Sequence, residues 1–196
     1  SASPFSQQTE LLNIPFGVFD DSFMHANHSN WNLGNWNFFD RDLYQHSPAG
    51  GELSYYTDYD QQNVLNPITG AHGTSYEQWA QDFHISYMMG NDQPGYQTEA
   101  RIKAASKASG YHFQVTAFRA NADSARVSIT NTGVAPIYYD AFPTVNGLSS
   151  DESLKHLVAG DTLHVEIPSG GAEPILTIES DRLVSGQVIE FEGYLE

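Results

Sequence analysis

The chain has 196 residues and a net charge of −16, with 24 Asp+Glu against 8 Lys+Arg. This acidity opposes binding to phosphate backbones and anionic lipid, so we expect no nucleic acid and no membrane as a partner. The chain contains no cysteine, which excludes disulfides, thiolate catalysis and cysteine-based zinc sites. No apolar run reaches the length of a transmembrane helix. The first residues, SASPFSQQTE, lack the pattern of a signal peptide, and we expect a processed chain or an excised piece.

The chain begins with a pattern typical of a buried strand. Residues 14–24, IPFGVFDDSFM, form an apolar run that contains Asp20 and Asp21 near its end. A continuous apolar run favours a strand buried on both faces. We therefore expect this strand to deliver two carboxylates to a pocket.

Residues 25–42 are the most unusual segment, because Trp31 and Trp36 lie among several asparagines. Indole rings stack on pyranose rings, and amide side chains bind hydroxyls, so the composition suits a saccharide site. The alternative is a long loop that its own aromatic residues fold onto the core. His25 and His28 could bind zinc, but two histidines without a third ligand favour the solvent-exposed interpretation.

Glu52 follows the Gly50-Gly51 pair and precedes Tyr55 and Tyr56. Glycine permits close approaches, and aromatic rings beside a carboxylate suit a sugar. The alternative is that the glycines form a turn and Glu52 binds loop backbone.

The following segment, YTDYDQQN at 56–63, places Asp58 and Asp60 at alternate positions. This spacing is compatible with a structural Ca²⁺ ion, although the glycine and distal glutamate of an EF-hand are missing. We expect a polar surface loop, and we expect no cofactor and no metal.

Residues 74–83 predict a helix that begins at a Ser/Thr cap, and residues 84–92 predict a further buried strand. Residues 97–110 give the clearest helix, with Thr98 as N-cap and Gly110 as the C-terminal stop. The order of strand, helix, strand and helix is typical of an α/β fold.

The second half alternates apolar and polar residues in short runs that Gly, Asn, Pro and Asp separate. Such runs predict an antiparallel β-sandwich. Tyr138 and Tyr139 could form a sugar platform there, but packing within a strand is favoured. The runs cover 111–120, 124–133, 161–168, 174–180 and 187–196.

Six segments occur in an order that resembles an uncharacterised bacterial family, the domain of unknown function 4832 family. They are FGVFDDSFM, AGGE, FHISYMMGND, ASGYHFQV, NTGVAPIYYDAFP and SGQVIEFEGYL. The resemblance implies an α+β chain with two parts. Residues 1–109 would correspond to the last units of a glycosidase-like (β/α)8 barrel, and residues 110–196 to an immunoglobulin-like antiparallel β-sandwich.

The resemblance also implies positions for polar residues at the strand ends, where such barrels carry their sites. Glu52 would end a late strand, Asp20 and Asp21 would end an earlier one, and His84 would enter the next. The barrel strands that usually supply a second carboxylate are absent from this sequence, which opposes catalysis.

We therefore expect a non-catalytic accessory module of a secreted bacterial polysaccharide-degrading enzyme. It would bind an uncharged or lightly charged polysaccharide or oligosaccharide, such as a galactan or glucan, and would have other domains of the parent enzyme as partners. One alternative is the C-terminal fragment of a glycoside hydrolase with Glu52 as a catalytic carboxylate. Another is a structural sandwich that braces a catalytic barrel. The predicted binding residues are Asp20, Asp21, Trp31, Trp36, Glu52, Tyr55, Tyr56 and His84.

Overall fold

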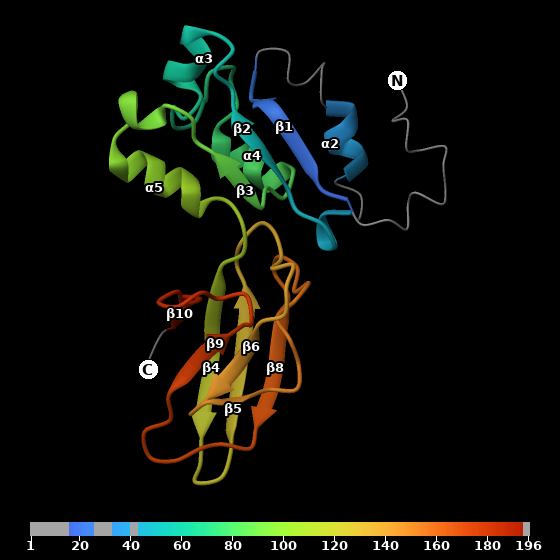
Figure 1. The fold of residues 1–196 in the computed structure, drawn as a ribbon, viewed down its shortest axis with the longest axis vertical. Coiled ribbons are helices and arrows are strands. Elements are labelled where there is room, and N and C mark those ends of the chain that lie inside the picture. The colour runs from blue at the N-terminus through green and yellow to red at the C-terminus, as the bar shows by residue number, and fades with distance from the viewer. Residues whose placement is uncertain (1–15, 26–32, 40–42, 194–196) are drawn as a thin grey trace. The chain divides into compact units, whose positions relative to one another are not determined.

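A computed structural model describes residues 16–25, 33–39 and 43–193. The chain divides into two compact units, Ser1–Gly110 and Tyr111–Glu196. Figure 1 shows the first unit as mixed helix and strand and the second as strands and loops, so the predicted α+β class is confirmed. In the part of the chain that is described, no helix combines the length and the apolar character needed to span a bilayer.

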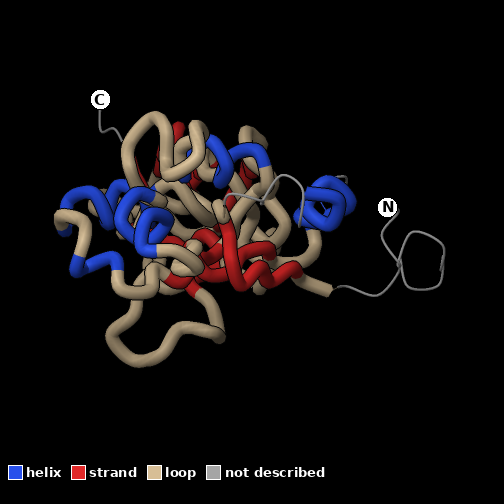
Figure 2. The backbone as a smooth tube through the Cα atoms, turned by 90° about the horizontal axis from the view of Figure 1, so that it is seen from above, coloured by secondary structure: helices blue, strands red, loops and turns tan. Residues whose placement is uncertain are grey.

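A three-stranded parallel sheet forms the centre of the first unit. Its strands, β1 (Val18–Phe23), β2 (Ala49–Leu53) and β3 (Tyr87–Met89), lie in chain order. Parallel neighbours require crossover connections, and short helices supply them. Figure 2 shows these helices in blue around the strands in red. They are α2 (Leu33–Phe39), η3 (Leu43–Gln45), α3 (Asp58–Asn63), α4 (Tyr76–Asp82), η4 (Gln93–Gly95) and α5 (Glu99–Lys107).

One face of this sheet packs against the helices. Phe23 of β1 and Leu53 of β2 are buried with Trp36 of α2, and Met88 of β3 is packed against the same cluster. Helices α4 and α5 contribute further apolar side chains to it. Because side chains alternate along a strand, the residues between these point to the opposite face.

Helices α4 and α5 begin where the sequence predicts. Ser75 accepts a hydrogen bond from the Gln78 amide at 3.2 Å, and Thr98 accepts one from the Arg101 amide at 3.2 Å. Both are N-caps that satisfy an otherwise unpaired helix amide. After α5 the chain turns at Gly110, whose φ of +77° favours glycine.

Two local predictions and one alternative are wrong. Segment 56–63 is not a loop, because Thr57 accepts a hydrogen bond from the Asp60 amide and starts helix α3. Only Tyr87–Met89 of the predicted buried strand 84–92 is extended, and its outer residues are exposed. Gly50-Gly51 forms no turn but the middle of the central strand.

The second unit contains two sheets that share one buried cluster. In the first sheet β4 (Phe113–Ala120), β5 (Ala125–Asn131) and β8 (Thr162–Ile167) are antiparallel, and β10 (Glu192–Gly193) joins β4 in parallel. The second sheet has the order β7 (Leu148–Ser149), β6 (Phe142–Val145) and β9 (Leu176–Glu179). Val127 and Ile167 of one sheet and Val145 and Ile178 of the other belong to the same core. All five alternating segments contain strands, and described residues 111–193 contain no helix.

The glycines of β2 are required by close backbone packing. A Cβ atom on Gly51 would lie 2.0 Å from the carbonyl oxygen of Asp20 in β1, whereas one on Gly90 would meet nothing within 4 Å. We therefore expect Gly51→Ala to lower the free energy of unfolding by about 1–3 kcal/mol or more through overpacking. Gly90→Ala should change it by less than about 0.5 kcal/mol. Urea denaturation followed by tryptophan fluorescence measures this, because all three tryptophans lie in the first unit. Equal midpoints for the two variants would contradict the close approach.

Candidate functional site

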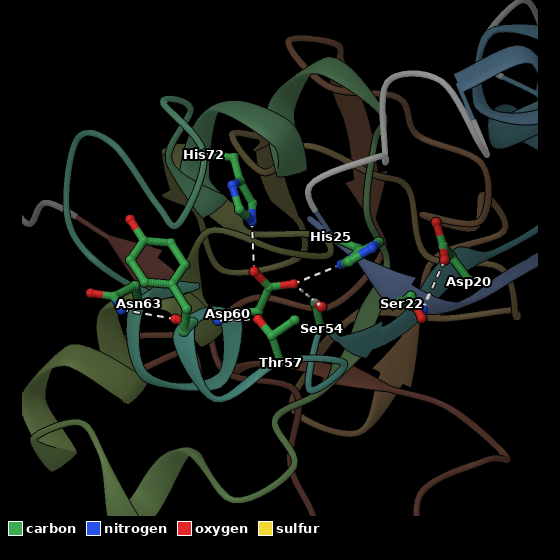
Figure 3. Close-up of polar contacts among 9 residues, drawn as sticks. Asp20, Ser22, His25, Ser54, Thr57, Asp60, Asn63 and His72 are labelled. Carbon is green, nitrogen blue, oxygen red and sulfur yellow. Dashed lines mark hydrogen bonds and ion pairs between the residues drawn. The ribbon is translucent and has the colours of Figure 1, made fainter.

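The carboxyl edge of the parallel sheet carries a buried carboxylate with three side-chain donors. His25 follows β1 and Ser54 follows β2, so both lie at this edge. We call Asp60, His25, Ser54 and His72 the Asp60 cluster. Figure 3 shows both imidazoles directed at the Asp60 carboxylate from different sides. His25 Nδ1 lies 2.8 Å and Ser54 Oγ 2.7 Å from Asp60 Oδ2, and His72 Nε2 lies 2.6 Å from Oδ1.

Local backbone structure positions each member of the Asp60 cluster. The Thr57 cap places Asp60 at the third helical position of α3, where a negative charge is favourable. The Ser54 amide donates to the Phe23 carbonyl at 2.8 Å, which joins the ends of β1 and β2. Met24 adopts a φ of +69°, and the His25 amide then donates to the Ser22 carbonyl at 3.0 Å.

Asp60 is ionised at neutral pH although only 1% of it is exposed. Burial raises the pKa of this carboxyl group, but the hydrogen bonds from His25, Ser54 and His72 together with the charge on His72 lower it further, so the net shift is downward. An ionised carboxylate only accepts hydrogen bonds, so His25 Nδ1 and His72 Nε2 each carry a proton. The other nitrogen of each ring does not contact Asp60, and both rings are partly exposed.

The Asp60 cluster is not a nucleophilic relay. In a Ser-His-Asp triad the serine hydroxyl donates to the histidine, which removes its proton. Here the Ser54 hydroxyl donates directly to Asp60. Both Asp60 oxygens accept hydrogen bonds from side chains, which also opposes coordination of Ca²⁺ by this residue.

Exposed tyrosine rings adjoin the Asp60 cluster. The Tyr56 ring lies 4.7 Å from that of His25, and the Tyr59 ring lies 5.8 Å from that of His72, measured between centroids. Tyr56 is 73% exposed, and Tyr55 and Tyr59 are each more than half exposed. Such exposure is unusual for large aromatic side chains, and it gives this edge several rings that a ligand can stack on.

Two predicted binding residues, Asp20 and Trp36, belong to the core instead. Trp36 is fully buried, with its ring 5.4 Å from that of Phe23 and 5.2 Å from that of Phe83. Its indole Nε1 donates to Asp20 Oδ2 at 2.9 Å, and the Ser22 amide donates to Asp20 Oδ1 at 3.0 Å. Trp36 therefore cannot stack on a sugar, and Asp20 orients the indole and the irregular end of β1.

His84 lies at the other edge of the sheet. It precedes β3, adopts a φ of +52° and stacks on Tyr44 with ring centroids 3.7 Å apart. Tyr44 belongs to η3, which precedes β2. His84 therefore enters the next strand as predicted. Because the strands are parallel, residues that precede them lie at the amino edge, so His84 lies apart from the residues at the carboxyl edge.

Asp21 and Glu52 lie within strands and not at strand ends. Asp21 is exposed, and Glu52 is half-buried on the face of β2 that points away from the helices. Trp31 lies outside the described residues. Of the predicted residues that the structure describes, Tyr56 lies against the Asp60 cluster and Tyr55 directly follows Ser54 in the chain.

The buried role of Asp60 and the contributions of Ser54 and His72 are not among the features predicted from the sequence. A readable signal existed, since Thr57 followed three residues later by Asp60 is close to a capping box and predicts a helix start. Among the residues that are described, no group of three or more His, Cys, Asp or Glu is arranged to hold a metal ion. The partner of His25 in the zinc hypothesis, His28, lies outside them.

Comparisons with models of protein families, with curated proteins and with solved structures find no match to this chain.

The burial of Trp36 leads to a stability prediction. Trp36→Ala should lower the free energy of unfolding by about 3–5 kcal/mol, because it leaves a cavity among Phe23 and Phe83. Trp36→Phe should lower it by about 1–3 kcal/mol, because the ring remains but Asp20 loses its donor. Urea denaturation followed by circular dichroism measures both losses. Unchanged stability in Trp36→Ala would restore this ring as a candidate ligand platform.

The lowered pKa of Asp60 predicts a pH dependence of stability. The unfolded state binds a proton at a higher pH than the folded state, so the contribution of Asp60 is present at neutral pH and lost as pH falls from about 5 through its folded pKa. At pH 7, Asp60→Asn should be less stable than wild type by about 1–3 kcal/mol. This difference should shrink as the pH falls below about 5. The control is Asp58→Asn, because Asp58 is exposed in the same helix turn. A difference that does not change with pH would contradict an ionised Asp60.

Proposed function

We propose that the first unit binds an uncharged saccharide at the carboxyl edge of its parallel sheet. The observation that carries the proposal is the pairing of exposed tyrosine rings with imidazoles that one buried carboxylate orients. Tyr56 lies beside His25, and Tyr59 lies beside His72. Ligands of parallel α/β sheets commonly bind at the carboxyl ends of the strands, which is the edge these residues occupy.

The chemistry of these groups matches that of a sugar ring. The C–H face of a pyranose stacks on an aromatic ring, and its hydroxyls both donate and accept hydrogen bonds. The outward nitrogens of His25 and His72 serve those hydroxyls, while Asp60 fixes the ring orientation from behind. Groups that are fixed before binding lose little conformational freedom on binding, which strengthens a small contact surface.

Charge favours a neutral ligand over an acidic one. Asp58 and Asp60 lie in the helix turn beside the rings, and the whole chain carries a net charge of −16. A sulfated or carboxylated polymer would be repelled. A neutral galactan or glucan fits better. A weak site of this kind suits an accessory module of a secreted enzyme, because it raises the concentration of the attached catalytic domain at the polymer substrate.

The arrangement favours binding without catalysis. Hydrolysis of a glycosidic bond usually needs two carboxyl groups about 5–9 Å apart on either side of the sugar. Asp60 is buried beneath three donors, and Glu52 points from the sheet face opposite the helices. We therefore propose an accessory role for the unit and assign no catalytic residue.

Removal of the tyrosine rings tests the site. Tyr56→Ala and Tyr59→Ala should each weaken retention in native affinity gels that contain agarose, laminarin or soluble starch. A lost stacking ring is worth about 1–3 kcal/mol by analogy with stacked bases, which corresponds to about tenfold or more in Kd. Both side chains are exposed, so folding should not change.

Phe19→Ala is the matched control, because Phe19 is 55% exposed in the same unit but lies within β1, away from the strand end. It should be retained like wild type. If all three variants and wild type migrate alike in every gel, the saccharide proposal is wrong. If Phe19→Ala alone loses retention, the ligand binds the sheet face and not its edge.

A further inference from the structure

Among the described residues, helices cover one face of the parallel sheet of the first unit and leave the other face uncovered. We call Phe19, Gly50, Glu52, Tyr87 and Met89 the outer face. Registry pairs Phe19 with Gly50, Gly50 with Tyr87 and Glu52 with Met89, so the five residues lie side by side. None of them belongs to the core cluster that packs against α2, α4 and α5.

The outer face is apolar and flat. Phe19 is 55%, Met89 46% and Tyr87 39% exposed. The Tyr87 ring lies across β2, because a Cβ atom on Gly50 would come within 2.8 Å of it, and its hydroxyl donates to the Val18 carbonyl at 3.3 Å. Because Gly50 has no side chain and the Tyr87 ring lies across it, another secondary-structure element could approach this part of the sheet closely.

Parallel sheets almost always have both faces covered. An exposed Phe, Tyr and Met in adjacent strands of such a sheet therefore mark a surface that another element covers. Three strands spaced by about 4.8 Å span about 10 Å, which is the diameter of one α-helix with its side chains. The width of the outer face thus matches a single helix.

Charge identifies the kind of helix. Glu52 lies within the outer face, Asp21 is exposed beside Phe19 in the same strand, and neither has a lysine or arginine among its neighbours in the outer face. The chain as a whole carries a net charge of −16, which opposes pairing with a second copy. Lysine or arginine beside an apolar stripe would complement both features of this surface.

We propose that the outer face is a docking surface for an amphipathic, basic helix of a protein partner. Phe19, Tyr87 and Met89 would contact its apolar stripe, and Asp21 and Glu52 would attract basic residues along its flanks. The saccharide edge and the outer face share no residue, so this proposal stands independently of the proposed function.

A designed peptide tests the proposal. The probe is a 14-residue peptide of leucine and lysine with helical periodicity, carrying a fluorescent label, and fluorescence anisotropy at 0.15 M salt gives its Kd for the full chain. Met89→Lys should raise Kd at least tenfold, since it places a positive charge beneath the apolar stripe. The double variant Asp21→Asn/Glu52→Gln should raise Kd by about threefold to tenfold. The peptide should also gain helical circular dichroism when it binds.

The controls separate docking from general attraction between a basic peptide and an acidic protein. Asp151→Asn/Glu152→Gln removes the same charge from exposed positions of the second unit, and Ile175→Lys adds lysine at an exposed apolar position there. Both should stay within twofold of wild type. Absence of saturable binding, or controls that weaken binding as much as the outer-face variants, would overturn the proposal. A wild-type dimer in sedimentation velocity that Met89→Lys dissociates would assign the face to self-association and overturn it as well.

Discussion

One buried carboxylate connects most of the first unit. Asp60 accepts hydrogen bonds from His25 after β1, from Ser54 after β2 and from His72 in the turn before α4. Its own amide is held by the cap of α3. A buried charge without partners is costly, so the ends of two strands, one helix and one turn must stay in place together. The same requirement fixes the imidazole rings of His25 and His72 at the exposed edge, because each is hydrogen-bonded to the buried carboxylate.

The polar groups of this unit divide into two sets with different tasks. Asp20 and Trp36 satisfy each other inside the protein and define how α2 lies on β1. His25 and His72 each contact Asp60 with one ring nitrogen, and both rings are partly exposed. Both sets contain a carboxylate and a ring N–H, so residue type alone does not separate them. Burial separates them, because Trp36 is fully buried whereas His25 and His72 are partly exposed.

Local signals in the sequence predicted the elements better than the site. Ser75 and Thr98 cap their helices as expected, and the alternating runs of residues 111–193 contain strands, because caps and periodicity depend on near neighbours. Which face of a strand or helix is covered depends on distant residues. Trp36 therefore looked like a platform among polar asparagines, and its partner, Asp20, is 16 positions away. Asp60 looked like a surface residue, because Ser54, His25 and His72 converge only after β1 and β2 pair.

The edge strand β10 of the larger sheet in the second unit is very short. Among the described residues, Glu192 and Gly193 pair in parallel with Gln114 and Val115 of β4. They cover the start of one side of this strand, whose other side pairs with β5 along its length. An uncovered strand edge recruits other chains, and it is a common starting point for intermolecular pairing. Shortening the polypeptide before residue 187 would therefore remove the pairing at Gln114 and Val115 and lengthen the open edge of β4, which favours pairing with another chain.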